Sequence, residues 1–552
     1  MIAAAGEENT AARTSVFSKL WPWLCAALSG LLMALCFAPF NIGGLAFVAL
    51  GPLLCAIWLK VPARRAGWYR LGLGYVAGLV FFTVTFSWLS ELGPLYDSVF
   101  LRSLPFLLAL YLSIYPAVWA WFAGWIAGSH FARVPLDRLL PPPRVPLLFS
   151  TYNLALSILV SAAWVATEWL RGPVITNFAW NALGVALYHP ATLPMIQAVE
   201  FTGVGGLSFV LMMCNAIGLI TVLRLREEIG RARIRPHFDF SATVALVVAL
   251  FFHGLWAYRN RQPAATVPLR VVAVQPDIPQ KWKFSNGKDA EIFERLDRLH
   301  GLAEALQPHL VLWPEASVPG GMLADVETQR FVRDHAGKVP ALLLGTDDFS
   351  RNRNSAAFIV RGREEVQFYD KRSLVAFGEF LPARPLLGWA LDGLVPGDFE
   401  AGTEAKIFEL AEPAIKFAPL ICFEDTVGNL VREPVQLGAN VLVNVTNDGW
   451  FGRSAAAEQH FVNAIFRAIE NRRPLIHATN TGVTASVDVL GNVVRWAAPF
   501  TAVAVQQQIH VPTGRETTFY TRNGEVFSIA CAALTLAAMA GRLWLLRRRR
   551  AN

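Results

Sequence analysis

The chain is organised around one stretch, Phe417-Ala418-Pro419-Leu420-Ile421-Cys422-Phe423-Glu424-Asp425-Thr426. Its apolar first half predicts a buried β-strand, and the Cys-Phe-Glu-Asp that follows predicts the turn leaving that strand. A side chain in such a turn lies at the end of a sheet, where α/β enzymes hold their reactive groups. Cys422 is therefore either a nucleophile or a small residue of the core.

The composition excludes an ordinary soluble protein. The 552 residues are 54% hydrophobic and only 16% charged, which predicts several membrane-spanning helices and leaves room for two or more domains. The formal net charge is +8, and half of it can be assigned to Arg547–Arg550 near the C-terminus. Because these arginines follow an apolar run, they indicate membrane topology rather than a nucleic-acid site.

Cysteine usage argues against a disulfide scaffold and against a metal site. Cys422 is the one cysteine of the predicted soluble portion, so it has no partner there. The other five lie in apolar, span-like stretches, where cysteine behaves as a small hydrophobic residue: Cys25, Cys36, Cys55, Cys214 and Cys531. The sequence has no CxxC motif or Cys/His cluster, and we expect neither a metal nor another cofactor.

Hydrophobic segments predict eight transmembrane helices, each near the length needed to cross a bilayer. Residues 1–18 are polar and predict no cleavable signal peptide. Seven segments follow and an eighth lies near the C-terminus, at residues 20–38, 42–59, 68–90, 102–127, 154–170, 202–223, 240–257 and 526–546.

The basic residues of the loops predict the orientation. Lysine and arginine are concentrated in the second, fourth and sixth loops and in the tail, whereas residues 91–101 contain none. Positive-inside bias therefore places both termini in the cytoplasm. It also places residues 258–525 on the outer side, which is the periplasm of a Gram-negative cell. We expect three parts: a membrane domain of seven helices (1–257), a periplasmic domain (258–525), and a last helix with a basic tail (526–552).

The periplasmic segment predicts an α/β fold with a central sheet, because short β-like runs alternate with helical patterns. The helical patterns are 289–306 and 455–471. The predicted strands are 269–274, 310–313, 341–344, 356–360, 366–369, 418–421, 441–445, 475–478 and 502–509.

Three of these strands end in a chemically useful side chain, namely Glu315, Lys371 and Cys422. If the strand ends converge, a carboxylate can remove the thiol proton, and an ammonium can stabilise the thiolate and a later oxyanion. The backbone N–H after Cys422 adds a further oxyanion donor. A Cys-His pair is the weaker interpretation, because His460 and His477 lie elsewhere in the segment.

Each residue alone has a structural interpretation. A single glutamate after Trp-Pro is usually a solvated turn residue, and a single lysine after Tyr-Asp is usually a surface charge. For Cys422 the core and nucleophile interpretations are about equal. The three together, in the order Glu, Lys, Cys, favour acyl-transfer chemistry.

The same order carries a resemblance to the nitrilase superfamily, which uses a Glu-Lys-Cys triad on an αββα sandwich. The whole chain resembles the apolipoprotein N-acyltransferase family over nearly its full length. The matching motifs are Phe37-Ala-Pro-Phe40, Trp313-Pro-Glu315, Tyr369-Asp-Lys371, Phe377-Gly-Glu379-Phe-Leu-Pro382, Ile421-Cys422-Phe-Glu424-Asp425, Asn444-Val-Thr-Asn-Asp-Gly-Trp450-Phe451-Gly452, Gln459-His460, Arg467-Ala-Ile-Glu470-Asn-Arg-Arg-Pro474 and Ala478-Thr-Asn480-Thr-Gly482.

The resemblance implies roles for the site residues. Cys422 becomes the nucleophile, Glu315 the general base and Lys371 the stabilising cation. Glu379 and Glu424 become supporting carboxylates that hold the lysine and shape the pocket. The family often has tyrosine after the nucleophile, where this chain has Phe423.

The resemblance also implies a two-step reaction, the last step of bacterial lipoprotein maturation. Cys422 takes an acyl chain from a phospholipid, typically phosphatidylethanolamine. The resulting thioester passes the chain to the α-amino group of a diacylglyceryl-cysteine at the N-terminus of an apolipoprotein. The implied location is the inner membrane, and we expect a monomer that binds no nucleic acid.

Both substrates are lipids, so the site must face the membrane. The apolar, proline-broken stretch 377–396 predicts either a membrane-dipping lid or ordinary core packing, and the two interpretations are equal. Trp389 and Leu391 belong to this stretch. Phe423 and Trp450 are further candidates for substrate contact, and residues 177–188 are a second candidate for lining the path of the lipid.

Two other functions compete with this interpretation. A membrane-anchored amidase or nitrilase would use the same triad but would need only one anchoring helix. A transporter with an inactive α/β domain is a rival from another class. It is disfavoured because charges in the spans are few, with Arg102 and Glu168 near their ends, and because the triad is intact.

Overall fold

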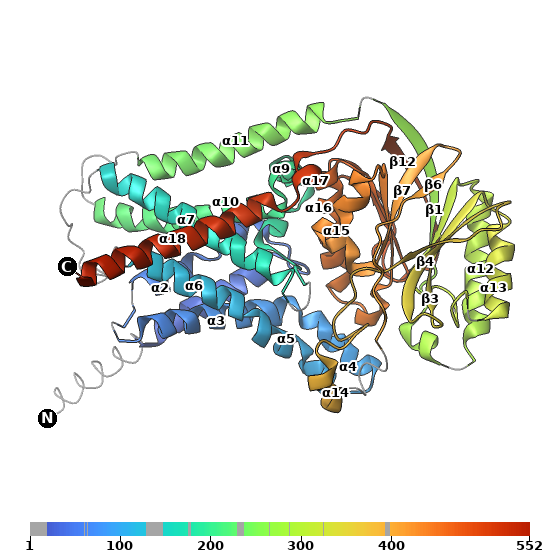
Figure 1. The fold of residues 1–552 in the computed structure, drawn as a ribbon, viewed down its shortest axis with the longest axis horizontal. Coiled ribbons are helices and arrows are strands. Elements are labelled where there is room, and N and C mark those ends of the chain that lie inside the picture. The colour runs from blue at the N-terminus through green and yellow to red at the C-terminus, as the bar shows by residue number, and fades with distance from the viewer. Residues whose placement is uncertain are drawn as a thin grey trace, which may run out of the picture.

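A bundle of helices lies beside a pair of stacked β-sheets (Figure 1). The structure is a computed structural model. It describes residues 19–59, 61–62, 64–128, 147–174, 178–228, 237–263, 265–285, 287–323, 325–391 and 398–551.

Each sheet has six strands. The first has the order β12-β1-β2-β3-β4-β5, and the second has the order β11-β10-β9-β8-β7-β6. The strands β1–β3 run parallel, as do β7–β9. The bounds are β1 Thr266–Gln275, β2 Leu310–Trp313, β3 Ala341–Asp348, β4 Arg353–Val360, β5 Gln367–Asp370, β6 Phe408–Leu410, β7 Ile415–Ile421, β8 Val441–Thr446, β9 Leu475–Thr479, β10 Ala485–Val487, β11 Val493–Trp496 and β12 Val503–Pro512.

Alternation along the strands separates two cores. In β2, Leu310 and Leu312 point into the core between the sheets, where they meet residues such as Phe417 and Val443 of the second sheet. Val311 and Trp313 point outward and pack under α12 (Asp289–Ala305) and α13 (Val326–Ala336). The apolar face of α12 consists of Ile292, Leu296, Leu299 and Ala303, at helical spacing.

The outer face of the second sheet is covered by α15 (Gly428–Gln436) and α16 (Ala456–Asn471). The domain is therefore an αββα sandwich, as the resemblance implies. The α15–α16 layer in turn faces the helical bundle (Figure 1), and one continuous apolar core joins the two. Ile465 of α16 and Leu442 of β8 belong to the same core as Leu53 and Met212 of the bundle.

The remaining elements form the bundle and its connections. They are η1 Gly43–Phe47, α2 Gly51–Leu59, α3 Ala66–Thr85, η2 Ser87–Glu91, α4 Leu92–Leu95, η3 Phe100–Ser103, α5 Leu104–Leu112, α6 Ile114–Ala127, α7 Leu147–Arg171, η4 Leu183–Leu187, η5 Pro190–Thr192, α8 Leu193–Ile196, α9 Val199–Thr202, α10 Val204–Glu228, α11 Phe238–Asn260 and α18 Val526–Ala551. Short helices in the sheet domain are η6 Gln280–Phe284, α14 Arg384–Leu391, η7 Cys422–Thr426, η8 Asp448–Phe451 and α17 Phe519–Asn523.

Within the described residues, five helices are long and apolar enough to cross a membrane. A sixth span results if α3 and the helix after its 53° bend count as one. Lys19–Ala34 and Gly43–Leu59 are apolar but shorter. The described residues therefore support a membrane domain with five or six full-length spans, and the eight spans stay a prediction. The predicted basic loops at 129–146 and 229–236 lie outside the described residues.

All nine predicted strands and both predicted helical patterns are present. Three further strands were not predicted, namely β6, β10 and β11, and neither were α13 and α15. The strands β6 and β10 have only three residues each, and every residue of β11 is exposed. They therefore lack the apolar run or clear alternation from which a strand is predicted.

Candidate active site

Cys422 occupies a sharp turn at the end of β7. It is the first residue of η7, and its φ of +54° lies in the left-handed region that non-glycine residues seldom adopt. The side-chain amide of Asn444, on the neighbouring strand β8, donates a 2.9 Å hydrogen bond to the Cys422 carbonyl oxygen. Sharp strand-to-helix turns of this kind present a nucleophile at the end of the sheet rather than along its strand.

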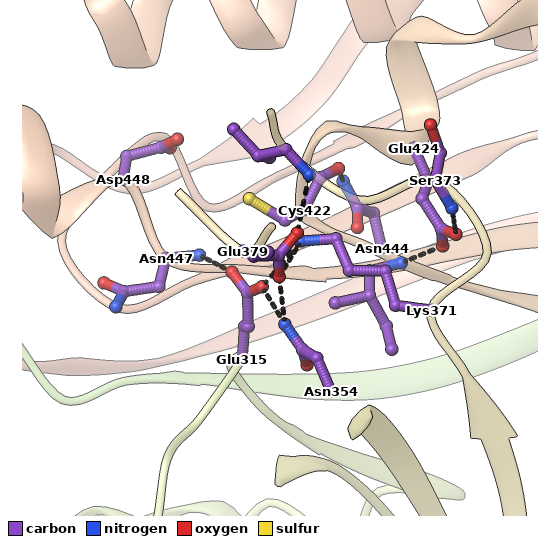
Figure 2. Close-up of polar contacts among 12 residues, drawn as sticks. Glu315, Asn354, Lys371, Ser373, Glu379, Cys422, Glu424, Asn444, Asn447 and Asp448 are labelled. Carbon is purple, nitrogen blue, oxygen red and sulfur yellow. Dashed lines mark hydrogen bonds and ion pairs between the residues drawn. The ribbon is translucent and has the colours of Figure 1, made fainter. Parts of the chain in front are cut away.

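Glu315 and Lys371 lie at the ends of β2 and β5 in the opposite sheet, and both point toward Cys422 (Figure 2). The Lys371 Nζ donates to Glu315 Oε1 at 3.2 Å. The backbone N–H of Asn447 donates to the other Glu315 oxygen at 3.0 Å. The structure thus brings together the three residues that the sequence singled out, across the gap between the two sheets.

Glu379 gives Lys371 a second carboxylate partner. The Lys371 Nζ donates to Glu379 Oε1 at 2.8 Å. The side-chain amide of Asn354, on β4, donates to the same Glu379 oxygen at 2.9 Å and to Glu315 Oε1 at 2.7 Å. One ammonium and one amide therefore bridge the two carboxylates and fix their positions.

Glu424 is fully buried and accepts its hydrogen bonds from backbone N–H groups and one tyrosine hydroxyl, not from the lysine amine. Its Oε1 accepts hydrogen bonds from the N–H groups of Arg372 and Ser373, at 2.6 and 3.1 Å, directly after Lys371. Its Oε2 accepts from the Ile421 N–H at 2.8 Å and from the Tyr369 hydroxyl at 2.9 Å. We predicted that Glu424 holds the lysine. Its contacts hold the turn after Lys371 against the end of the nucleophile strand.

The electrostatics of the site keep the thiol protonated at rest. Burial and the Glu315 charge raise the pKa of Cys422 well above its usual range, and Lys371 only partly offsets them. Burial disfavours the Lys371 ammonium, but Glu315 and Glu379 outweigh it and hold the pKa of Lys371 well above its usual value. A protonated thiol beside a fixed ammonium needs a base to become a nucleophile, and Glu315 is the adjacent carboxylate.

The other predicted contact residues are more widely spread. Phe423 is buried in the core shared with the bundle, and Trp450 is half-buried in η8. Trp389, on α14, is 90% exposed and so does not pack in a core. The side chain of Leu391 and residues 392–397 lie outside the described part of the chain.

The structure adds Lys283 to the site, a residue that the sequence analysis missed. Its Nζ, in η6, donates at 2.7 Å to the carbonyl oxygen of Ala316, next to Glu315. Burial lowers the pKa of Lys283 to about 8, while Asp347 and Glu315 act in the opposite direction. Burial also raises the pKa of Asp347 to about 6. No local pattern around Lys283 distinguishes it from a surface lysine.

A second buried polar cluster lies behind the nucleophile turn and was also missed. The side chains of Asp425, His460 and His477 meet there, with ligand-type atoms all within 4.8 Å of one another. The sequence analysis found no metal-binding cluster because these residues are far apart in the chain. Most of their ring nitrogens already have protein partners: His460 contacts two carboxylates, and His477 Nδ1 lies 2.8 Å from the Val483 carbonyl oxygen.

Two family models match the chain, one for each part. The apolipoprotein N-acyltransferase N-terminal domain matches residues 29–217, and the carbon-nitrogen hydrolase family matches residues 270–518. The first match ends within α10 and the second begins within β1, so α11 belongs to neither.

Relatives resemble the chain over nearly its whole length. An apolipoprotein N-acyltransferase of Geobacter metallireducens is 31% identical over 94% of this chain and 95% of its own. That of Methylococcus capsulatus is 32% identical over 86% of this chain and 88% of its own. Among solved structures, an amidase from Nesterenkonia sp. is 16% identical with a TM-score of 0.33, covering 46% of this chain and 92% of that chain.

Proposed function

Because the chain belongs to the apolipoprotein N-acyltransferase family, we propose that it moves an acyl chain from a phospholipid to a lipoprotein through a thioester on Cys422. The acceptor is the N-terminal α-amino group of an S-diacylglyceryl-cysteine, and the reaction is the last step of lipoprotein maturation. The single observation that carries the proposal is the meeting of Cys422, Lys371 and Glu315 between the two sheets.

In the first step the thiol becomes a thioester. Glu315 accepts the proton of Cys422 as the sulfur attacks the ester carbonyl of a phospholipid, preferably phosphatidylethanolamine. The Lys371 ammonium and the Phe423 N–H stabilise the oxyanion of the tetrahedral intermediate. When the intermediate collapses, the ester C–O bond breaks, and the lysophospholipid leaves with the proton from Glu315.

In the second step the acyl chain passes to nitrogen. The free α-amino group of the acceptor attacks the thioester carbonyl, and Glu315 takes a proton from the nitrogen. The C–S bond then breaks, an amide forms, and the sulfur of Cys422 regains a proton from Glu315. Lys371 stabilises charge in both steps and keeps its own proton throughout, in agreement with its raised pKa.

We further propose that all eight predicted segments cross the inner membrane, with both termini in the cytoplasm and the sheet domain in the periplasm. We also propose that the protein works as a monomer.

The basic loops support the orientation with cytoplasmic termini. A cysteine at Leu437, exposed on the sheet domain, should react with an impermeant maleimide from the periplasmic side, whereas one at Arg65 should react only after lysis. The reverse pattern would contradict the orientation.

The test of function uses the purified enzyme, phosphatidylethanolamine vesicles and a diacylglyceryl-cysteine peptide with a free N-terminus. We expect the peptide to gain one acyl chain on its α-amino group by mass spectrometry, with no gain for Cys422→Ala. A peptide acetylated at its N-terminus should also gain none. Hydrolysis of simple amides without any peptide acylation would contradict the proposal and favour an amidase.

A further inference from the structure

The buried side chain of Gln459, on α16, makes all of its side-chain hydrogen bonds to the helical bundle. Its Oε1 accepts from the indole N–H groups of Trp88 and Trp180 at 3.1 and 3.2 Å, and from the Asn181 amide at 2.9 Å. Its Nε2 donates to the carbonyl oxygens of Ala38 and Thr85 at 2.8 and 3.0 Å. One glutamine thus connects three separate segments of the bundle to one helix of the sheet domain.

The next residue, His460, connects that helix to the nucleophile turn. Its ring nitrogens each lie 2.9 Å from a carboxylate, Nδ1 from Asp448 and Nε2 from Asp425. Burial disfavours the imidazolium, but these two carboxylates outweigh it and raise the pKa of His460 well above its usual value. His460 is therefore a cation that holds η7 and η8 together.

Asp425 and Asp448 are both connected to the reacting residues Cys422 and Glu315. Asp425 accepts a hydrogen bond from Asn444, and the same amide of Asn444 donates to the Cys422 carbonyl oxygen. Asp448 follows Asn447, whose backbone N–H donates to Glu315. The His460 cation therefore contacts the supports of both the nucleophile and the base.

The bundle also packs on these supports directly. The Trp180 ring packs against the His460 ring at a tilt of 38°, with centroids 5.3 Å apart. The Trp88 ring meets Phe451 of η8 edge-on, with centroids 4.5 Å apart. The same two tryptophans that bond Gln459 therefore also contact His460 and the η8 helix that carries Asp448.

We propose that Gln459 and His460 are positioning residues through which the membrane bundle sets the geometry of Cys422. This inference deepens the proposed function, since it rests on Cys422 being the nucleophile. The strained φ of Cys422 needs support from the surrounding structure. The Asn444–Asp425–His460 chain supplies it, and the bundle fixes that chain at Gln459.

The test compares two buried glutamines at the same interface. Gln459→Met keeps the length of the side chain and removes its hydrogen bonds to the bundle. Gln197→Met is the matched control, because Gln197 bonds Leu490 and Arg472 of the catalytic domain from α8's C-terminal end, away from the Cys422 supports. His460→Gln removes the cation. The readouts are the alkylation rate of Cys422 by iodoacetamide and the melting temperature.

We expect Gln459→Met and His460→Gln to slow alkylation about tenfold or more, with kcat for acyl transfer falling and KM nearly unchanged. Gln197→Met should stay within about twofold of wild type. Trp180→Phe keeps an aromatic ring but loses the hydrogen bond to Gln459, so its alkylation rate should fall between the two. This variant serves as the test if Gln459→Met does not fold. The alkylation rate tests the positioning role even if the protein transfers no acyl chain. The proposed function is tested separately, because acyl transfer that persists in Cys422→Ala would refute it.

Three results would overturn the inference. Alkylation of Gln459→Met at or above the wild-type rate would show that the bundle does not position the thiol. Equal slowing by Gln459→Met and Gln197→Met would indicate a general loss of packing. Stoichiometric zinc in the purified protein, lost in His460→Gln, would make the Asp425–His460–His477 cluster a metal site instead.

Discussion

At the scale of single residues, the site balances one ammonium against two carboxylates around a neutral thiol. Glu315 and Glu379 both bond Lys371, and Asn354 bridges the two carboxylates. Cys422 therefore stays protonated before the substrate arrives. It lets the sulfur lose its proton only as it attacks, which protects the half-buried Cys422 from chance reactions with other electrophiles.

Glu315→Gln should separate thiol acidity from general-base catalysis. Since the Glu315 charge raises the pKa of Cys422, removing it should lower that pKa and speed the alkylation of Cys422 at neutral pH. The same variant lacks the base, so acyl transfer should fall about 10²- to 10⁴-fold. Both rates can be followed by mass spectrometry on one preparation. Slower alkylation with normal transfer would contradict these roles.

The pH dependence gives the matching test. In the wild type, the alkylation rate should rise with pH through the neutral and mildly alkaline range without a plateau, because the pKa of the thiol lies well above its usual range. The Glu315→Gln profile should shift to lower pH. The Lys371→Met profile should shift to higher pH, because that ammonium lowers the pKa of Cys422. Superimposable profiles would refute the electrostatic account.

The sequence predicted the residues that end strands and missed those that only tertiary contacts define. Glu315, Lys371 and Cys422 each follow a predicted strand, and the stacking of the two sheets brings the ends of β2 and β5 toward the end of β7. Asn354 carries no such signal, and His460 is singled out only by the Gln459-His460 motif and as the weaker partner for Cys422, with no positioning role. Asn354 lies inside a strand, and His460 lies in a helix that would look the same if its histidine faced solvent.

At the scale of elements, α14 follows Glu379 in the chain and presents an apolar side chain outward. Its Trp389 is 90% exposed, and the stretch 377–396 begins near Glu379, which is hydrogen-bonded to Lys371. Membrane-interface helices commonly place tryptophan at the headgroup level. Of the two interpretations of the stretch 377–396, the membrane-dipping arm is the one we propose, because the exposed Trp389 does not pack in a core.

Trp389→Ser should raise the KM for phosphatidylethanolamine in vesicles several-fold, about 1 kcal/mol for a lost interfacial tryptophan, with little change in the alkylation of Cys422. Trp496→Ser is the matched control, since Trp496 is 60% exposed on β11 at the edge of the second sheet. Initial rates against lipid concentration measure the effect. Equal KM values for the wild type and Trp389→Ser would refute the proposal of a membrane-dipping arm.

The elements that escaped prediction share a physical reason. The helix α15 contains Pro434, which normally argues against a helix interior, and it is stabilised by packing on β7 and α16. The strand β11 is exposed throughout and forms by pairing with β10. Neighbours that lie elsewhere in the chain decide both elements, so a local pattern cannot predict them.

At the scale of the whole molecule, the bundle and the sandwich share one core. Leu53 and Met212 of the bundle belong to the same apolar cluster as Ala464 and Ile465 of α16. In a free nitrilase-like domain, the outer face of α16 would need another cover. Here the membrane bundle is that cover. This dependence could not be predicted from the sequence, because each part has a clear pattern of its own.

A fragment of residues 265–512 should therefore fail as a soluble domain. Without the bundle, the apolar and polar contacts of α16 are exposed, including those of Gln459, and we expect the fragment to aggregate or bind a hydrophobic dye. The full-length protein in detergent should remain monodisperse by size-exclusion chromatography. A monomeric fragment with a cooperative melting transition would show that the shared core is dispensable.

The central claim is that Cys422 carries an acyl group taken from a phospholipid, and intact-protein mass spectrometry tests it most directly. After incubation with phosphatidylethanolamine, the account predicts a mass gain of one acyl chain that hydroxylamine removes and that Cys422→Ala does not show. An unmodified Cys422, with its thiol still reactive and the lipid still intact, would contradict it.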